Sequence, residues 1–383
     1  MRNFLLVFFL LYGALHLYAF LIAKAAFDFG ILTGVIMALF FAFMVIAPVI
    51  IRQSENAGLK LFARGLAWVG YTWLGVIFLF FSTSLLIDVY RLAVYLGSMM
   101  SHKDLSFFAL SAKSVFFIPL VVAAGIAAYG YKEALNIRTE HVIINTLKLP
   151  VGVNRIRIAQ ISDVHLGLIV RRKRLGLILD KVKEASPDIL VSTGDLIDGQ
   201  INGLEGLSDI LREINPRYGK FAVLGNHEYY AGLKQTIAFM KVAGCTLLRG
   251  EGISIEGIIN LIGVDDPAAE YFNGYDDSME TRLLASFSRE SFTVLLKHRP
   301  LINKDSLSLF DLQLSGHVHK GQIFPFSLLT KIYYPKHAGM VSANGNILYV
   351  SRGSGTWGPP IRFLANPEVT VIDIVRLDAR KGT

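Results

Sequence analysis

Residues 155–165 read Arg-Ile-Arg-Ile-Ala-Gln-Ile-Ser-Asp-Val-His, and this stretch decides the fold. Its first seven residues largely alternate between polar and apolar side chains, which is typical of a half-buried β-strand. The run ends at Ser162, and Asp163 and His165 follow directly. Carboxylate and imidazole groups are ligands of transition metals. The stretch therefore predicts a strand whose carboxyl end carries two side chains able to bind a metal ion.

The same arrangement recurs along the chain. Apolar residues repeat at helical spacing between Leu175 and Val182, and Pro187 stops this helix. Short apolar runs at 189–191, 221–224, 293–297 and 312–314 then precede Gly194-Asp195, Gly225-Asn226-His227-Glu228, His298, and Gly316-His317-Val318-His319. Ligands of α/β sheets bind outside the carboxyl ends of the strands. We therefore expect these distant side chains to converge at one edge of an α/β domain.

Each group alone is weak, because Asp-x-His and Gly-Asp are common by chance. In this order, however, the groups resemble the calcineurin-like metallophosphoesterase superfamily, whose pattern runs D-x-H, G-D-x-x-D, G-N-H-E, a lone His and G-H-x-H. The second motif stands here as Gly194-Asp195-Leu196-Ile197-Asp198, and the resemblance covers residues 137–376. The tail resembles the membrane-associated branch of the family through Gly321-Gln322, Ser351-Arg352-Gly353 and Gly355-Thr356-Trp357-Gly358-Pro359-Pro360.

The resemblance implies a fold and a role for each motif residue. The fold would be an α/β sandwich of two mixed sheets flanked by helices. Asp163, His165 and His319 would hold one metal ion, Asn226, His298 and His317 would hold a second, and Asp195 would bridge both. His227 would be the acid that protonates or stabilises the leaving oxygen. The cofactors would be two divalent transition-metal ions, with Mn, Fe and Zn all open.

The chemistry of the ligands supports this reading independently. Phosphate esters resist attack because the phosphate is anionic and the leaving alkoxide is poor. Two cations about 3.5–4 Å apart neutralise the phosphate, lower the pKa of a shared water and stabilise the displacement. Imidazole and carboxylate ligands suit Mn, Fe and Zn. The set therefore favours an enzyme, a metal-dependent phosphoric ester hydrolase that cleaves a phosphoester or pyrophosphate bond.

Several residues near the motifs keep two readings. Asp198 either supports a metal ligand from behind or caps the next turn. The basic run 171–174 is either a solvated helix start or a site for an anionic head group. Lys320 replaces the glycine that usually follows the last His of the family. We take Lys320, Arg352 and Arg362 as candidate substrate-binding residues, although Lys320 could also point away from the site and the Gly/Pro run 353–360 also suits a simple turn.

The first 135 residues have a different character from the rest. Hydrophobic residues make up 53% of the chain and the mean hydropathy is +0.47, with nearly all of the excess before residue 135. Four apolar runs, at 4–22, 30–51, 67–86 and 114–131, reach the roughly 20 residues that a membrane-spanning helix needs. We therefore expect a four-helix transmembrane domain over residues 1–135, followed by the phosphoesterase domain over residues 136–383.

Charge sets an expected topology. The chain carries a net charge of +8, which we assign largely to loops between spans, so that no nucleic-acid partner is expected. Six Lys/Arg residues flank the spans on one side and four on the other, which predicts a multi-pass cell-membrane protein with a cytoplasmic catalytic domain. Arg2, the first apolar run and Ala25-Ala26 also fit a cleaved signal peptide. The single cysteine, Cys245, excludes an internal disulfide and a thiolate zinc cluster. The oligomeric state stays open.

Three rival functions follow from the membrane half and the motifs. A transporter with a regulatory hydrolase domain would need ionisable groups inside the spans, and only His16 qualifies; we expect that residue to make an interhelical contact. A non-catalytic sensor on a decayed fold would have lost ligands. An enzyme for soluble nucleotides or phosphoproteins is the third alternative.

The segment after the last motif points to the substrate. Residues 323–329 and 332–335 are apolar and aromatic, and Pro325 and Pro335 predict neither a regular helix nor a central strand there. The segment is either a loop packed on the core or a lip that dips into the membrane, with Lys331 and Lys336 meeting anionic head groups. The second reading makes the bilayer a partner and favours a lipid-linked or membrane-proximal phosphate or pyrophosphate as substrate.

Overall fold

The computed structural model describes residues 2–199, 204, 206–272, 276, 278–343 and 345–377. The chain divides into two compact units, which we call the helical unit and the sandwich unit. The helical unit comprises Met1–Lys132 and Gly358–Ile361, and the sandwich unit comprises Glu133–Trp357 and Arg362–Thr383. Each unit is described by itself below.

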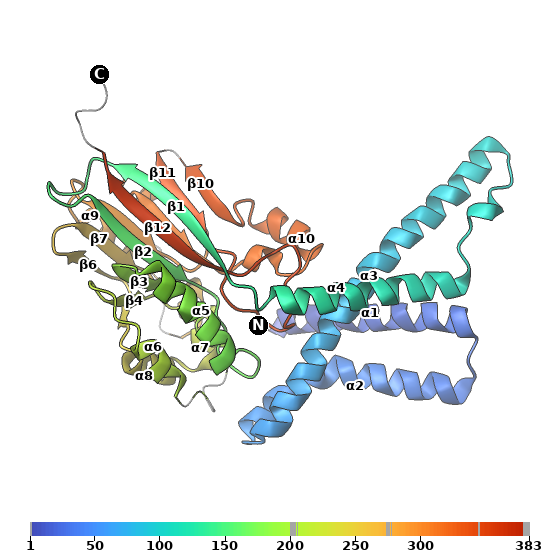
Figure 1. The fold of residues 1–383 in the computed structure, drawn as a ribbon. Coiled ribbons are helices and arrows are strands. Elements are labelled where there is room, and N and C mark those ends of the chain that lie inside the picture. The colour runs from blue at the N-terminus through green and yellow to red at the C-terminus, as the bar shows by residue number, and fades with distance from the viewer. Residues whose placement is uncertain are drawn as a thin grey trace. The chain divides into compact units, whose positions relative to one another are not determined.

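Long apolar helices make up the helical unit (Figure 1). They are α1 (Arg2–Phe27), α2 (Ile31–Asn56), α3 (Lys60–Ser101) and α4 (Ala112–Glu133), and the short helix η1 (Ser106–Phe108) precedes α4. Within the described residues, four helical segments are long and apolar enough to cross a membrane. They overlap the four apolar runs found in the sequence.

Helix α3 is much longer than the span 67–86 expected from hydropathy. It has 42 residues, which at 1.5 Å per residue gives about 63 Å, roughly twice the hydrocarbon thickness of a bilayer. No proline interrupts residues 87–101, and the helix ends only where His102 turns into the left-handed conformation, with φ at 51°. Hydropathy located residues 67–86 of this helix but not its extensions at 60–66 and 87–101.

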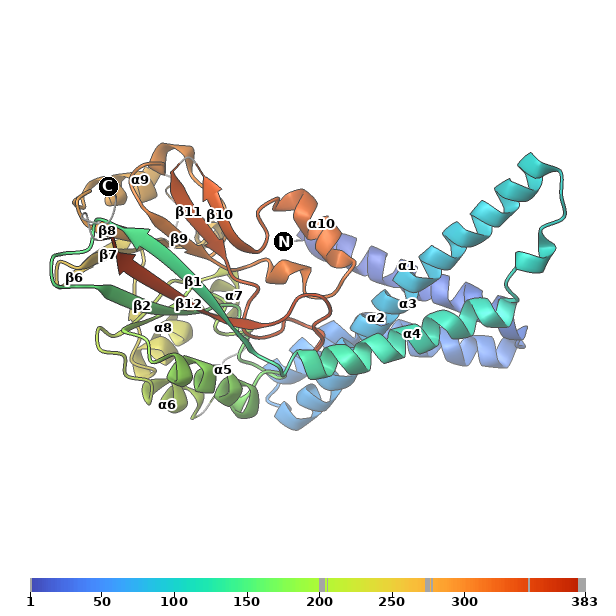
Figure 2. The same ribbon diagram turned by 45° about the horizontal axis from the view of Figure 1, so that its top comes forward.

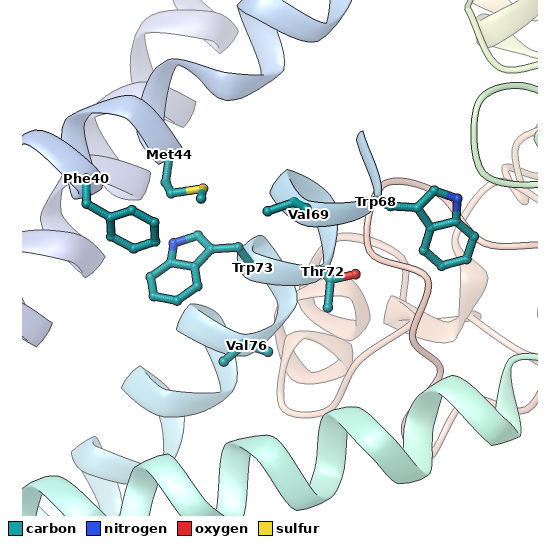
Figure 3. A pocket seen from close by; sticks show the side chains of 7 residues that line it. All are labelled: Phe40, Met44, Trp68, Val69, Thr72, Trp73 and Val76. Carbon is teal, nitrogen blue, oxygen red and sulfur yellow. The ribbon is translucent and has the colours of Figure 1, made fainter. Parts of the chain in front are cut away.

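The interior of the helical unit holds one well-satisfied polar group. His16 of α1 is buried, and its Nε2 accepts a hydrogen bond of 2.8 Å from Trp73 Nε1 of α3. Its Nδ1 therefore carries the proton and donates to the Tyr12 carbonyl at 2.7 Å. Nearby, α2 and α3 border an apolar hollow (Figure 3) lined by Phe40, Met44, Trp68, Val69, Thr72, Trp73 and Val76. No side chain of this lining is ionisable, which suits a lipid-facing surface better than a transport path.

Two six-stranded mixed sheets form the sandwich unit. The first has the order β1 (Arg138–Thr146), β12 (Glu368–Arg376), β2 (Arg155–Ile161), β3 (Ile189–Ser192), β4 (Lys220–Ala222) and β5 (Thr246–Leu247). The second has the order β10 (Gly339–Ala343), β11 (Asn346–Val350), β9 (Leu312–Ser315), β8 (Phe292–Leu296), β7 (Ile259–Gly263) and β6 (Glu251–Ile255). Strands β2 to β5 are mutually parallel, as are β7, β8, β9 and β11. The expected pair of mixed sheets is confirmed.

Apolar side chains fill three interfaces of this unit. Between the sheets, Ile158 and Val191 of the first pack with Val294 and Leu314 of the second. The other face of the first sheet is covered by α5 (Arg172–Ala185), α6 (Leu207–Arg212) and α8 (Leu233–Val242), and that of the second by α9 (Ser278–Ala285) (Figure 2). Each fully buried aliphatic side chain contributes about 1.5–3 kcal/mol. The packed layers hold the strand ends, and the loops after them, in fixed positions.

Short helices complete the sandwich unit. They are α7 (Asn226–Ala231), η2 (Pro267–Tyr271), η3 (Lys304–Ser306), η4 (His319–Gly321) and α10 (Phe326–Tyr333). The expectation that the segment after the last motif forms no regular helix is wrong, because α10 occupies most of it. Pro325 stands at the N-cap and Pro335 lies beyond the C-cap Tyr334, so the prolines bracket the helix rather than interrupt it. None of the residues of α10 is buried.

Candidate metal centre

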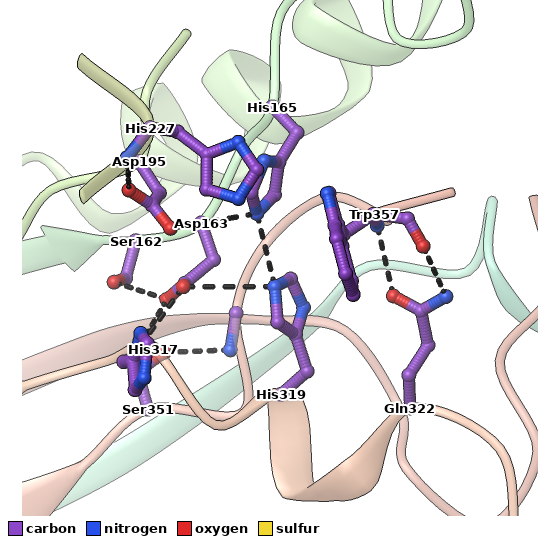
Figure 4. Close-up of polar contacts among 12 residues, drawn as sticks. Ser162, Asp163, His165, Asp195, His227, His317, His319, Gln322, Ser351 and Trp357 are labelled. Atoms are coloured by element: carbon purple, nitrogen blue, oxygen red, sulfur yellow. Dashed lines mark hydrogen bonds and ion pairs between the residues drawn. The ribbon is translucent and has the colours of Figure 1, made fainter. Parts of the chain in front are cut away.

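Loops from both sheets deliver ligand-type side chains to one place (Figure 4). Asp163 and His165 follow β2, Asp195 follows β3, Asn226 follows β4, His298 follows β8, and His317 and His319 follow β9. Ligand atoms within 4.8 Å of one another define one group of Asp163, His165 and His319, another of Asp195, His298 and His317, and a third of His165, Asp195 and His227. The structure thus brings the motif residues together, although the chain separates the first and last by more than 150 positions.

The first group points its nitrogens and oxygens at a common point. His165 Nε2 lies 3.0 Å from His319 Nε2, and His319 Nε2 lies 3.6 Å from Asp163 Oδ1. All three residues are buried. Two imidazole nitrogens that face each other beside a carboxylate make a donor set of the kind that a shared divalent cation requires.

The second group has the same character. His298 Nε2 lies 3.2 Å from Asp195 Oδ2 and 3.2 Å from His317 Nδ1. His298 Nδ1 lies 2.8 Å from the Thr193 carbonyl, which can only accept, so the ring proton sits on Nδ1 and leaves a lone pair on Nε2. A histidine that donates through its far nitrogen is oriented in the way typical of metal ligands.

Asp195 stands between the two groups. Its Oδ2 is 3.2 Å from His298 Nε2 and 3.9 Å from His165 Nε2. Its other oxygen, Oδ1, accepts the backbone N–H of His227 at 2.9 Å, which fixes the carboxylate plane. One oxygen therefore faces both groups, as a bridging ligand would need.

An unpartnered buried atom tests whether a cation fits here. The Oδ1 atom of Asn226 is buried and accepts no hydrogen bond among the described residues. A buried acceptor without a partner costs about 1–3 kcal/mol. The amide oxygen of Asn226 belongs to the loop that also carries His227, and it is a ligand type that a divalent cation accepts. The residues present therefore fit the ions that the motif pattern implies.

The protonation of the buried side chains in the site follows from their mutual contacts and their burial. Burial opposes ionisation of both Asp195 and His298, but their mutual attraction prevails: it holds the pKa of Asp195 well below its usual range and raises the pKa of His298 to about 10. Burial lowers the pKa of His317 and His319 well below the usual value, and the Arg362 charge adds to this at His319. Neutral imidazoles are the form that binds a metal, and bound ions would take the place of the protons.

Backbone strain is concentrated in the same loops. Asp163, His165, Asp195, His317 and His319 have φ values of 52°, 55°, 51°, 73° and 46°. Residues with a Cβ rarely adopt this left-handed region, because the Cβ crowds the following carbonyl. Such strained residues persist only where the surrounding structure fixes them, and they gather at functional sites. Five of the candidate ligands share this feature.

Two motif glycines are needed because neighbouring carboxylates lie too close for a Cβ at these positions. A Cβ on Gly225 would lie 2.2 Å from Asp195 Oδ1, and a Cβ on Gly316 would lie 2.2 Å from Asp163 Oδ2. The backbone after Gly316 uses this closeness, because the N–H of His317 donates to Asp163 Oδ1 at 2.9 Å. Any larger residue would push a ligand loop away from its carboxylate.

The side chain of Asp198 lies closer to His227 than to the ligand candidate His165. Its Oδ1 lies 2.9 Å from His227 Nδ1 and 3.8 Å from His165 Nδ1. Burial opposes protonation of His227, but the charge of Asp195 and the hydrogen bond that His227 donates to Asp198 outweigh it and raise the pKa of His227 to about 9. His227 is thus held by Asp198 in a fixed orientation with a proton to give, as general acids require.

Glu228 was quoted in its motif but given no role by the sequence. Its carboxylate accepts the backbone N–H groups of Asp195 at 2.8 Å, Ile197 at 3.0 Å and Gly225 at 2.7 Å. It therefore joins the loop after β3 to the loop after β4. The position of Glu228 three residues after the N-cap Gly225 is a capping pattern that could have revealed it.

Arg299 is a second residue that sequence reasoning missed. It directly follows His298, and its Nε and Nη2 donate to Asp266 at 2.7 and 2.9 Å. The Asp266 side chain is fully buried, whereas 26% of the Arg299 side chain is exposed. No periodicity marks this residue, since its partner lies more than 30 positions away.

The candidate substrate residues take different places. Arg362 is fully buried, its Nη1 donates to the carbonyls of His319 and Arg352, and its Nη2 lies 3.0 Å from His319 Nδ1. Arg352 forms ion pairs with Glu140 and Glu368. The burial of Arg362 argues against direct substrate contact and places it behind His319. Lys320 adopts φ of 51° next to His319, and its role stays a prediction.

Comparisons with known proteins give the family to which the chain is similar. The family model for the calcineurin-like phosphoesterase matches residues 156–321. A metallophosphoesterase of Aquifex aeolicus is 38% identical over 67% of this chain and 98% of its own length. A zebrafish transmembrane protein with a metallophosphoesterase domain is 31% identical over 67% of this chain, which spans only 61% of that protein. A 5'-nucleotidase precursor of Thermus thermophilus aligns with a TM-score of 0.35 at 17% identity, over 58% of this chain and 54% of its own.

The fold, the converging ligand loops and the first relative define the class. The chain belongs to the calcineurin-like metallophosphoesterase family. It is a metal-dependent phosphoric ester hydrolase, and its long apolar helices indicate a membrane protein.

Proposed function

We propose that this protein is a membrane-anchored, dinuclear-metal phosphoesterase that cleaves a phosphoester or pyrophosphate bond of a lipid-linked or membrane-proximal substrate. The observation that carries the catalytic part is the position of Asp195, a member of the second ligand group, whose Oδ2 lies 3.2 Å from His298 Nε2 and also 3.9 Å from His165 Nε2 of the first group. Together with the unpartnered Asn226 oxygen, this arrangement supports two adjacent cation sites rather than one.

The proposed ligand sets follow these groups. Asp163, His165 and His319 hold one ion, whereas Asn226, His298 and His317 hold the other, and Asp195 bridges them. The ligand types suit Mn, Fe or Zn. When bound, such a pair supplies charge neutralisation for the phosphate and an activated water.

The chain's own residues perform the remaining steps. Asp198 holds the Nδ1 side of His227, so that the Nε2 proton is directed away from Asp198 and is available to the leaving oxygen. The raised pKa of His227, which the Asp195 charge and the Asp198 hydrogen bond cause against the effect of burial, keeps that proton in place at neutral pH. Glu228 holds the loops that carry Asp195 and His227 in register. His227 is therefore the proposed catalytic acid and Asp198 its positioning residue.

The helical unit is the proposed anchor. Its four apolar helices support four membrane spans within residues 1–135, with the phosphoesterase domain over 136–383. The excess of Lys and Arg on one side of the spans supports a cytoplasmic catalytic domain. The satisfied contacts of His16 support an anchor rather than a transporter.

Helix α10 supports a membrane-proximal substrate. One face of it carries Leu328, Leu329, Ile332 and Tyr333, which are 55%, 59%, 78% and 80% exposed. Tyr334, at its end, lies with its ring centroid 5.5 Å from that of His317. An apolar face this exposed beside a metal ligand favours contact with lipid over packing on a core, and Lys331 adds a basic group on the same helix.

A substrate panel tests the enzymatic proposal. The full chain, purified in detergent, is assayed with phosphomonoesters, phosphodiesters, nucleotides, a phosphoprotein and lipid pyrophosphates, with Mn, Fe and Zn varied. We expect metal-dependent turnover with preference for the lipid substrates. Turnover confined to soluble nucleotides or phosphoproteins would favour the soluble-substrate alternative, and absence of any turnover would favour a non-catalytic sensor.

The lipid-facing role of α10 has its own test. In the test variant, Leu329 and Ile332 are replaced by Ser. In the control variant, Ser replaces Leu147 and Val151, which are 63% and 90% exposed elsewhere on the sandwich unit. In vesicles, lipid hydrolysis by the α10 variant should fall roughly tenfold or more, because two apolar side chains lose membrane burial. Hydrolysis of a soluble chromogenic phosphodiester should persist. Equal loss on both substrates, or equal loss in the control, would contradict the proposal.

A further inference from the structure

Two exposed aromatic rings flank His227. The Trp357 ring centroid lies 5.7 Å from that of His227 with the planes at 75°, and the Tyr230 ring lies 5.8 Å away at 66°. Trp357 is 49% exposed and Tyr230 is 40% exposed. Figure 4 shows the indole standing beside His227 and His319. The rings are therefore open to solvent at the proposed acid, not packed into the core.

The backbone of Trp357 is clamped by one side chain. Gln322 Nε2 donates to the Trp357 carbonyl at 2.8 Å, and the Trp357 N–H donates to Gln322 Oε1 at 2.9 Å. Gln322 immediately follows the turn η4 that holds His319. These two hydrogen bonds connect the Gly321-Gln322 motif with the motif that contains Trp357. The sequence alone assigned no chemical role to either motif. The two hydrogen bonds use only backbone groups of residue 357, so any residue other than proline would complete them.

The indole itself is thus not needed for the clamp. A half-exposed tryptophan gains little from burial, and its large apolar face is available for a ligand. The clamp fixes where that face stands relative to His227. An aromatic ring positioned in this way at a solvent-open site is the arrangement that binds another ring by stacking or edge contact.

We propose that Trp357 and Tyr230 wall a leaving-group subsite that takes a group with a flat ring. This inference rests on the proposed role of His227, because the oxygen that receives its proton belongs to the leaving group. Whatever is attached to that oxygen must lie beside the rings that flank His227. The substrate class is therefore a phosphoester or pyrophosphate whose departing part carries a base-like or aryl ring close to the phosphate, with Gln322 as the positioning residue of Trp357.

Binding of two non-hydrolysable phosphonates tests the subsite. Benzylphosphonate carries a flat ring one carbon away from the phosphorus, and ethylphosphonate carries no ring. Calorimetry on the metal-loaded full chain should give a preference for benzylphosphonate of roughly three- to tenfold, the effect of one aromatic contact. Trp357→Ala should bring the ratio of the two affinities close to one, and Trp357→Phe should keep most of it.

Further variants separate positioning from general damage. In Gln322→Glu, one carboxylate oxygen still accepts the Trp357 N–H, but the other faces the Trp357 carbonyl and repels it. This variant should therefore lower the ratio of the two affinities. Met340→Ala, which removes a 57% exposed apolar side chain from β10, should leave the ratio as it is. An unchanged ratio in Trp357→Ala, with both phosphonates still bound, would overturn the subsite while leaving the phosphoesterase proposal intact. If neither phosphonate binds the wild-type protein, the proposed phosphate site fails and the subsite with it.

Discussion

At the scale of single residues, the contact between Asp198 and His227 links the second motif to the third. The 2.9 Å distance from Asp198 Oδ1 to His227 Nδ1 determines which ring nitrogen faces the substrate. Asp198 itself is outside both ligand groups. Its removal should therefore affect proton transfer and leave metal binding intact.

Replacing Asp198 with Asn tests this separation. The amide cannot stabilise a charged imidazole as the carboxylate does, so the pKa that Asp195 and Asp198 now raise at His227 against burial should fall. We expect kcat to drop at least about tenfold with the metal content unchanged. Asp209→Asn, an exposed carboxylate in α6, is the control. Loss of metal in Asp198→Asn, or an unaltered kcat, would show that the contact has another purpose.

A buried ion pair beside the site makes a stability prediction. Lys297 Nζ lies 2.6 Å from Glu280 Oε2, with both side chains less than 10% exposed. Glu280→Ala leaves the ammonium buried without its partner, which costs about 3–5 kcal/mol. The exposed pair of Lys181 and Glu184 is the control, and Glu184→Ala should cost no more than about 1 kcal/mol. Chemical denaturation of the full chain in detergent measures both, and similar losses would contradict the burial argument.

The site could be predicted from the sequence as far as its motifs reach. The sequence is enough to predict Asp163, His165 and Asp195 as ligands, because each follows an apolar strand and its side chain is of a type that binds metals. Glu228 and Arg299 act through contacts with backbone N–H groups and with Asp266, and such partners depend on how the loops meet. Sequence also gives no sign of burial: Arg362, an arginine next to a glycine-rich run, lies fully buried beside His319.

At the scale of elements, strand β12 holds the first sheet together. It lies between β1 and β2, parallel to the first over nine residues and antiparallel to the second. Arg157 of β2 donates from Nε and Nη2 to Asp373 of β12 at 2.8 Å each. Alternation predicted β2, and short apolar runs predicted β3, β4, β8 and β9, but the pairing of β1 with a strand more than 200 residues later has no local signal.

Truncation tests the importance of β12. A chain that stops at Pro367 lacks this strand, which leaves the apolar side chains of β1 and β2 without their partner. We expect loss of the folded sandwich unit, measured as rapid proteolysis and loss of all hydrolysis. A chain that stops at Leu377 keeps β12 and should behave like the full protein. Activity in the shorter chain would contradict the assigned strand order.

The sequence prediction that residues 323–335 form no regular helix was wrong, because helix α10 lies there. The two prolines predicted an irregular segment, yet they lie just outside the helix, at positions that proline tolerates. Composition correctly identified the segment as apolar and aromatic. Only the structure shows that its apolar side chains are exposed.

At the scale of the whole molecule, the charged residues that flank the spans predict the membrane topology. Six Lys/Arg residues on one side of the spans and four on the other predict that the C-terminus is cytoplasmic. A cytoplasmic reporter fused to the C-terminus should be active, and a periplasmic one should be silent. The reverse result would point to cleavage of the first span, which N-terminal sequencing of the purified protein would check.

The most direct measurement of the central claim is the metal content of two variants, taken together with their turnover. Asp195→Ala removes the shared ligand, so it should lose bound metal and activity by several orders of magnitude. His227→Ala removes the acid alone, so it should keep two ions per chain and turn over roughly 10²–10⁴-fold more slowly. An Asp195→Ala protein that retains its metal and near-wild-type activity would contradict the dinuclear assignment.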